Sequence, residues 1–162
     1  MIIDPSNVPE TTGSNYPEQF KSLVAGRFKK RLGNIANLKN FGVNLVKLKP
    51  GSRSVLRHWH TKQDEFIYIL EGEATLVTNA GKQILKSGMA AGFPAGEADG
   101  HHLLNLSDAD VVYLEIGDRL CRCAERNRTS QDTVDYPDDD LIAVDDAGTW
   151  RFTHKDGSFY NA

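Results

Sequence analysis

Residues 57–72, RHWHTKQDEFIYILEG, combine a metal-ligand pattern with a strand pattern. His58 and His60 are two positions apart, and side chains two apart on a β-strand point to the same face. A carboxylate follows at Asp64 or Glu65, at the start of a segment rich in aromatic and β-branched residues. Imidazoles with one carboxylate suit a transition metal better than magnesium or calcium. Taken alone, this H-x-H pair is equally typical of exposed strand histidines.

Short strand candidates flank this stretch on both sides. They are separated by glycine- and proline-containing turns at intervals of roughly ten residues, which is typical of an antiparallel sandwich or barrel. The sequence does not show the alternation of strands and helices that is typical of a parallel α/β fold. The sequence therefore predicts an all-β chain, with strands expected at 43–49, 54–60, 65–70, 73–78, 83–85, 90–93, 101–106 and 110–116.

Two further histidines, His101 and His102, open one of these later strand candidates. On a strand, His101 would share a face with Leu103 and Asn105, whereas His102 would point to the opposite side. Either imidazole is a candidate third nitrogen ligand at this stage.

These segments resemble the two sequence motifs of the cupin family. The first motif runs from a glycine through H-x-H and a glutamate to a second glycine, here Gly51, His58, His60, Glu65 and Gly72. The second runs from a glycine through P-x-G to a histidine and an asparagine, here Gly88, Pro94, Gly96, His101 and Asn105. The loops before His58 and before His101 are longer than in the family's usual pattern.

The resemblance implies a cupin double-stranded β-helix, a jelly-roll-like antiparallel barrel with N- and C-terminal extensions. It implies one divalent transition metal (Zn, Mn, Fe or Ni) held by His58, His60, Glu65 and His101. The motif spacing favours His101 over His102 and Glu65 over Asp64, and both alternatives stay open. We expect one structural domain overall, with an N-terminal arm packing on the barrel, a cupin core and a C-terminal extension at residues 1–41, 42–117 and 118–162.

Small single-barrel cupins include sugar-phosphate isomerases. The resemblance therefore implies a metal-dependent enzyme acting on a small polyoxygenated substrate such as a sugar phosphate, with Glu65 as the candidate catalytic base. An Fe(II) dioxygenase-type cupin and a non-catalytic cupin that binds a sugar or another small molecule are the alternatives. The basic run 27–31 is more typical of a solvated surface than of phosphate recognition. Basic residues nearer the motifs are candidates to attract a phosphate, namely Lys47, Lys49, Arg53, Arg57 and Lys62.

Composition limits the partners. The 162 residues are 40% hydrophobic and carry a net charge of −3, which suits one hydrophobic core and does not favour nucleic acid. No apolar stretch is long enough to span a membrane, so no membrane association is expected. Cys121 and Cys123 are interpreted as free thiols of a cytoplasmic protein. The long extensions could shield sheet edges, which predicts a homodimer.

Overall fold

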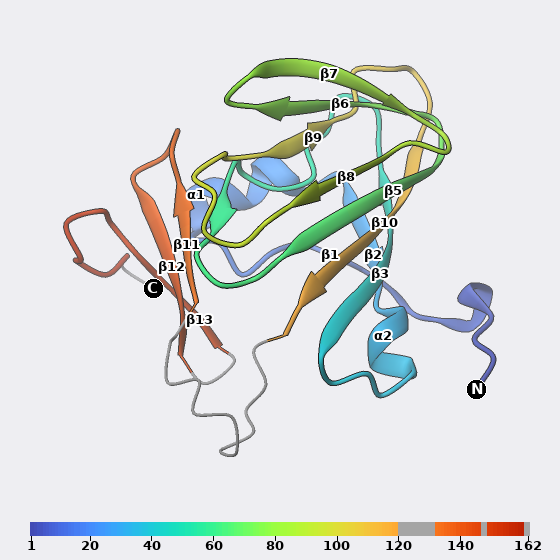
Figure 1. The fold of residues 1–162 in the computed structure, drawn as a ribbon, viewed down its shortest axis with the longest axis horizontal. Helices are drawn as coiled ribbons and strands as arrows, with labels where there is room; N and C mark the ends of the chain where they lie inside the picture. Colours follow the sequence, from blue (N-terminus) through green and yellow to red (C-terminus); the bar gives the residue numbers. More distant parts are fainter. Residues whose placement is uncertain (120–131, 147–148, 161–162) are drawn as a thin grey trace.

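The computed structural model, which describes residues 1–119, 132–146 and 149–160, consists mainly of antiparallel sheets (Figure 1). The largest sheet has six strands in the order β1 (Glu10–Thr12), β2 (Arg27–Lys30), β3 (Phe41–Leu48), β10 (Val111–Asp118), β5 (Glu65–Glu71) and β8 (Ala90–Phe93). A three-stranded sheet contains β7 (Gly81–Lys86), β6 (Glu73–Thr78) and β9 (His102–Leu104). A four-stranded sheet contains β13 (Thr149–Thr153), β12 (Leu141–Asp146), β11 (Thr133–Tyr136) and β4 (Trp59–His60).

In the part of the chain that the structure describes, helical structure is confined to short turns before the central strands. These are η1 (Pro5–Asn7), α1 (Glu18–Lys21), η2 (Ser22–Val24) and α2 (Leu32–Ile35). Within the described ranges, no helix has the length and apolar character needed to cross a bilayer. The prediction of an all-β fold is confirmed, and the arrangement is that of a jelly roll.

Two of the expected strands are shorter than predicted. Only β4 forms within 54–60, and only β9 within 101–106. The two segments meet at isolated bridges that join Arg53 to Leu104 and His58 to His101. Six residues, 53–58, therefore lie opposite four residues, 101–104, and the surplus residues cannot pair. The longer loop before His58 is accommodated in this way.

One other expectation was wrong. The basic run 27–31 is not simply a solvated surface, because Arg27–Lys30 forms β2 inside the large sheet. The side chains of Phe66 and Tyr68 lie on the outer face of β5 and are 41% and 38% exposed. Cys121 and Cys123 lie outside the described residues.

Two apolar clusters hold the sheets together. The first lies between the large sheet and the β7-β6-β9 sheet and includes Val46, Ile69, Leu76 and Tyr113. The second packs the β13-β12-β11-β4 sheet against the N-terminal segment that contains Tyr16. Residues of both clusters line a cavity of about 600 Å³, so the cavity lies where the two clusters meet.

The motif residues that carry no metal-binding group shape the backbone. Gly72 has φ +79°, and a Cβ there would lie 2.7 Å from the Asp110 carbonyl oxygen, so only glycine fits this turn. Asn105 is fully buried, and its side-chain amide donates hydrogen bonds of 2.8 Å to the carbonyl oxygens of Leu48 and Ala109. Asn105 therefore fastens the loop after β9 to the end of β3.

Candidate metal centre

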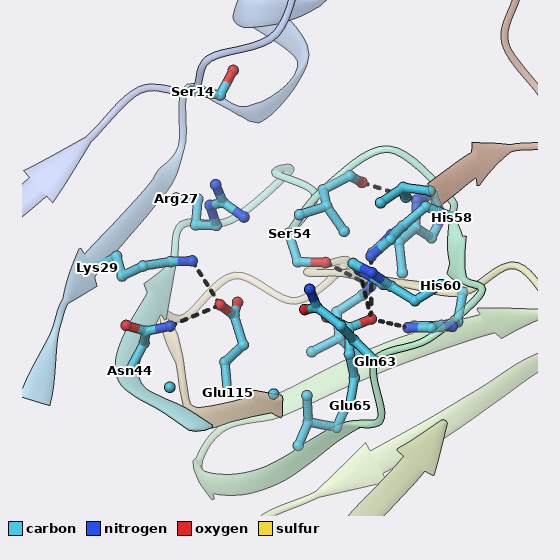
Figure 2. Close-up of a pocket in the computed structure, with 18 of the residues that line it drawn as sticks. Ser14, Arg27, Lys29, Asn44, Ser54, His58, His60, Gln63, Glu65 and Glu115 are labelled. Carbon is cyan, nitrogen blue, oxygen red and sulfur yellow. Dashed lines mark hydrogen bonds and ion pairs between the residues drawn. The ribbon is translucent and has the colours of Figure 1, made fainter. Parts of the chain in front are cut away.

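The four predicted ligands come from three segments and point into the same cavity. His58 and His101 form a bridge in which each backbone N–H donates to the other's carbonyl oxygen, at 3.2 and 2.9 Å. Directly paired residues project to the same side of a sheet, and His60 follows His58 by two positions. Glu65 enters from the large sheet at the start of β5. Figure 2 shows the side chains of His58, His60 and Glu65 converging on one side of the cavity.

The distances between donor atoms fit a single metal ion. Glu65 Oε2 lies 3.2 Å from His58 Nε2, 3.6 Å from His60 Nε2 and 3.0 Å from His101 Nε2. Zinc–nitrogen and zinc–oxygen bonds of about 2.0–2.2 Å place neighbouring ligand atoms roughly 3–3.5 Å apart. The donor atoms of His58, His60 and Glu65 all lie within 4.8 Å of one another, whereas His101 lies outside this group and contacts it through Glu65.

Each imidazole is anchored through its other ring nitrogen. The Nδ1 atoms of His58 and His101 lie 3.0 and 3.2 Å from the backbone carbonyl oxygens of Leu56 and Asp99. The Nδ1 atom of His60 lies 2.5 Å from Oδ2 of Asp132. In the metal-free protein each Nε2 faces Oε2 of Glu65, but an oxygen acceptor at Nδ1 can keep a proton there and so leave the Nε2 lone pair for a metal ion that replaces the Nε2 proton. All three Nε2 atoms are therefore prepared for coordination.

Aromatic rings pack against the same imidazoles. Phe93 of β8 stacks on His101 with ring centroids 3.5 Å apart and planes inclined by 3°. Tyr136 of β11 stacks on His58 with ring centroids 5.8 Å apart, and Trp150 of β13 meets His60 edge to face at 5.9 Å. Because the rings restrict rotation of the imidazoles, the site is held in position by packing as well as by hydrogen bonds.

The electrostatics of the site favour a carboxylate surrounded by imidazoles. Burial disfavours the Glu65 anion, but His58, His101 and His60 outweigh this effect and hold the pKa of Glu65 well below its usual range. Burial also disfavours a charged His60, but hydrogen bonding to Asp132 and the charge of Glu65 prevail and raise the pKa of His60. A divalent ion would take the place of the protons that these groups attract.

Neither alternative ligand belongs to the group of donor atoms, although His102 lines the same cavity. The Nδ1 atom of His102 lies 3.2 Å from the Val55 carbonyl oxygen, and burial lowers the pKa of this imidazole to about 4. Oδ1 of Asp64 accepts a hydrogen bond of 2.7 Å from the backbone N–H of Ala95. The structure therefore brings together His101 and Glu65, and neither His102 nor Asp64 reaches the other donors.

The cavity continues away from the imidazoles to a charged wall that was not predicted. Arg27 and Lys29 of β2 line it together with Asn44 of β3 and Glu115 of β10 (Figure 2). The five basic residues that were candidates to attract a phosphate do not line this cavity. Three of them form ion pairs elsewhere, in which Lys47 pairs with Glu10, Lys49 with Asp110 and Arg57 with Asp138.

Comparison with known proteins places this architecture in a family. A family model described as a cupin domain matches residues 44–117. A crystal structure from Silicibacter pomeroyi, described as a sugar phosphate isomerase from a cupin superfamily, is 38% identical, with a TM-score of 0.90 over 100% of this chain and 98% of that one. The chain belongs to the cupin superfamily. A comparison with curated proteins gave no match.

Two further structures resemble this cupin. A protein from Acidithiobacillus ferrooxidans, provisionally described as a sugar phosphate isomerase, is 29% identical, with a TM-score of 0.70 over 84% of this chain and 81% of that one. A protein from Thermotoga maritima, inferred to be an oxalate decarboxylase, is 24% identical, with a TM-score of 0.59 over 74% of this chain and all of that one. The second likeness concerns the fold alone.

Proposed function

We propose that this cupin is a cytoplasmic, homodimeric, metal-dependent isomerase of sugar phosphates. The observation that carries the proposal is the convergence of three Nδ1-anchored imidazoles and Glu65 at one end of a cavity whose other end is cationic. A sugar phosphate has hydroxyl and carbonyl oxygens for a metal and a phosphate for a cationic wall. The two relatives described as sugar phosphate isomerases support this choice of substrate.

The metal ion would be held by His58, His60, Glu65 and His101, and when bound it supplies a Lewis acid that polarises a substrate carbonyl. Zinc, manganese, iron and nickel all accept this donor set. The cavity of about 600 Å³ is large enough to hold a small sugar phosphate. The aromatic rings around the imidazoles exclude water from the back of the site.

Aldose–ketose interconversion also requires a base that takes a proton from the carbon beside the carbonyl and returns it to the neighbouring carbon. Glu65 is our candidate for this base, as expected from the sequence. The structure adds Glu115, whose Oε1 accepts hydrogen bonds from Lys29 and Asn44. Glu65→Gln is expected to weaken metal binding as well as turnover, whereas Glu115→Gln would lower kcat with the metal retained if Glu115 is the base.

The test is isomerisation by protein stripped of metal and reloaded with zinc, manganese, iron or nickel in turn. Aldose and ketose phosphates are supplied in heavy water, and NMR records both product and deuterium incorporation at the carbons that exchange protons. Conversion with at least one metal, lost in His58→Ala, supports the proposal. Deuterium exchange without net conversion would still identify the proton-transfer step. Absence of both exchange and conversion with every metal would contradict the isomerase assignment.

The alternatives predicted from the sequence give different results in the same preparation. Oxygen consumption that depends on iron would identify a dioxygenase. Tight binding of a sugar phosphate without exchange or turnover would identify a binding protein. Both outcomes keep the metal site and replace the isomerase activity.

We also propose that the outer face of the large sheet binds a second copy of the chain. Phe66 and Leu70 are 41% and 38% exposed there, and Leu114 and Ile116 of β10 lie on the same face. The solvated face of an antiparallel sheet is normally polar, so an apolar outer face indicates a covered surface. Light scattering is expected to show a dimer that Phe66→Glu converts to a monomer. Ile84→Glu, at an exposed apolar position of another sheet, should leave the dimer intact.

The chain is proposed to work as one domain that includes both extensions. Asp132 and Trp150 lie within the C-terminal extension and contact His60. Tyr16 of the N-terminal arm packs on Tyr136 with ring centroids 5.7 Å apart. Both extensions thus contact the metal centre or its supporting residues.

A further inference from the structure

The charged wall across the cavity from the imidazoles is built by the inner face of the large sheet. Arg27 and Lys29 lie on one face of β2 because they are two positions apart, and they pair across the strands with Leu48 and Val46, which are buried. Figure 2 shows Arg27, Lys29 and Glu115 on one side of the cavity and the imidazoles on the other. The wall thus faces any molecule that reaches the metal centre.

The charge of Lys29 is already balanced. Its ammonium group lies 2.6 Å from Oε1 of Glu115, and the side-chain amide of Asn44 donates to the same oxygen at 3.0 Å. Burial opposes the Glu115 anion, but Lys29 and Arg27 outweigh this effect and lower the pKa of Glu115. Lys29 and Glu115 therefore form a neutral pair that contributes little net charge to the cavity.

Arg27 is not balanced in this way. Among the described residues, its guanidinium group makes no hydrogen bond and no ion pair, although it lines the cavity. A guanidinium group has a rigid fork of N–H donors that matches the oxygens of a phosphate or a carboxylate. Glu115, the carboxylate that feels the charge of Arg27, is already paired with Lys29, so the two cations of this wall share one anion.

A second donor on the same wall has no partner either. Tyr113 of β10 pairs with Val46 on the inner face, is only 1% exposed and lines the cavity. Its hydroxyl is buried without a hydrogen-bond partner in the described structure. Ser54 lies near enough to affect the Tyr113 pKa, but burial dominates and raises it, and no hydrogen bond of acceptable geometry joins the two hydroxyls. A buried donor of this kind usually has an acceptor in the functional state.

We propose that Arg27 and the Tyr113 hydroxyl form an anion-binding subsite that holds the phosphate of the substrate while its sugar oxygens face the metal centre. The identification of the anion as a phosphate ester rests on the proposed function. Arg27 and Lys29 against Glu115 leave one excess positive charge on this wall without any metal ion, and a divalent ion against Glu65 would add another. A phosphate monoester, with about two negative charges near neutral pH, would balance it.

The test measures binding of inorganic phosphate to the metal-free protein by isothermal titration calorimetry, with acetate as the carboxylate probe. Without a metal ion, phosphate cannot bind beside the imidazoles by coordinating the metal. The measured binding also does not depend on turnover of a substrate. Phosphate is expected to bind more tightly than acetate. Arg27→Met should weaken phosphate binding by about 10-fold or more, and Tyr113→Phe by roughly 3- to 10-fold, since charge-assisted hydrogen bonds are lost.

Arg53→Met is the matched control, because Arg53 lies outside the cavity, and it should change phosphate affinity by less than about 2-fold. Tyr113→Phe removes only a hydroxyl that has no protein partner, so it keeps the test valid if Arg27→Met does not fold. Failure of phosphate to bind, equal binding of acetate, or unchanged affinity in Tyr113→Phe would each overturn the proposal. Phosphate binding that depends on Arg27 in a protein without isomerase activity would leave the subsite standing and reject only the proposed function.

Discussion

Replacing Asp132 by asparagine is expected to weaken metal binding while leaving the fold intact. Asp132 is fully buried, and its carboxylate accepts hydrogen bonds from Thr61 and from the backbone N–H of Lys62, at 3.1 and 2.8 Å. Its other oxygen lies 2.5 Å from Nδ1 of His60. Asparagine has the same shape and can still accept from Lys62, but its amide N–H would then face the proton on His60. The imidazole must shift that proton to Nε2 or turn away, and either change removes a metal ligand.

The size of the effect follows from how many ligands depend on Asp132. Only His60 depends on Asp132, because Nδ1 of His58 and Nδ1 of His101 are held by backbone carbonyl groups that no side-chain substitution removes. Loss of a carboxylate partner behind a ligating histidine typically weakens metal affinity about 10- to 100-fold, or roughly 1.4–2.7 kcal/mol. Three donors stay in place, so binding should be weakened rather than abolished.

Competition with a zinc-binding fluorescent indicator measures the dissociation constants of the natural protein and the variant. Asp135→Asn is the matched control. Asp135 lies on β11, the strand that follows Asp132, opposite Trp59 and pointing away from the imidazoles, so its replacement should leave the affinity unchanged. An Asp132→Asn protein that binds zinc as tightly as the natural protein, while His60→Ala binds it weakly, would refute the role assigned to Asp132.

Three further outcomes are expected. His101→Ala should lower zinc affinity by at least about 10-fold and His102→Ala by less than about 2-fold, and equal losses in the same titration would contradict the choice of ligand. Burial lowers the pKa of His60, but Asp132 and Glu65 raise it more, so its pKa in the folded protein lies above the unfolded value of 6.5. The stability that His60 gives the metal-free protein is therefore present below pH 6.5 and is lost as the pH rises through the folded-state pKa of His60. The lowered pKa of Glu65 gives stability above pH 4.5 that is lost on acidification, so thermal unfolding midpoints should be highest between these two values, and a flat profile would contradict this. Asn105→Ala removes the side-chain donor to the buried Leu48 carbonyl oxygen, whereas the Ala109 carbonyl oxygen keeps the Ser107 hydroxyl as a donor. The free energy of unfolding in urea should fall by about 1–3 kcal/mol, and a loss below about 0.5 kcal/mol would show that water replaces the amide.

His58 and His60 could be proposed from a local signal, whereas Glu65 was chosen over Asp64, and His101 over His102, from the spacing of the cupin motifs. His58 and His60 share a strand face by spacing alone, and Glu65 begins the next strand. Asp132 could not be found in this way, since it lies 72 residues from His60 in the sequence and no short pattern marks an aspartate that will be buried beside a histidine. Such partners are brought together by the topology of the sheets.

The five basic residues that were candidates to attract a phosphate lie outside the cavity for a related reason. Lys47 was a candidate because it is close in sequence to the first motif, but it pairs with Phe28 on the outer face of the large sheet. Lys29 and Arg27 belong to the inner face because their partners on β3 point into the core. A change of one position reverses the face of a strand, so counting charges near a motif cannot tell the cavity from the surface.

The origin of these groups indicates how the site is assembled. The cupin core 42–117 supplies all four donor atoms, and in the case of His58 and His101 it also supplies the carbonyl groups that orient them. His60 is different, since its orienting carboxylate and its aromatic neighbour come from Asp132 and Trp150 of the C-terminal extension. The N-terminal segment contributes Arg27 to the opposite wall. The core thus carries the metal-ligand pattern, while the C-terminal extension supplies the group that orients His60 and the N-terminal segment supplies Arg27 of the proposed anion subsite.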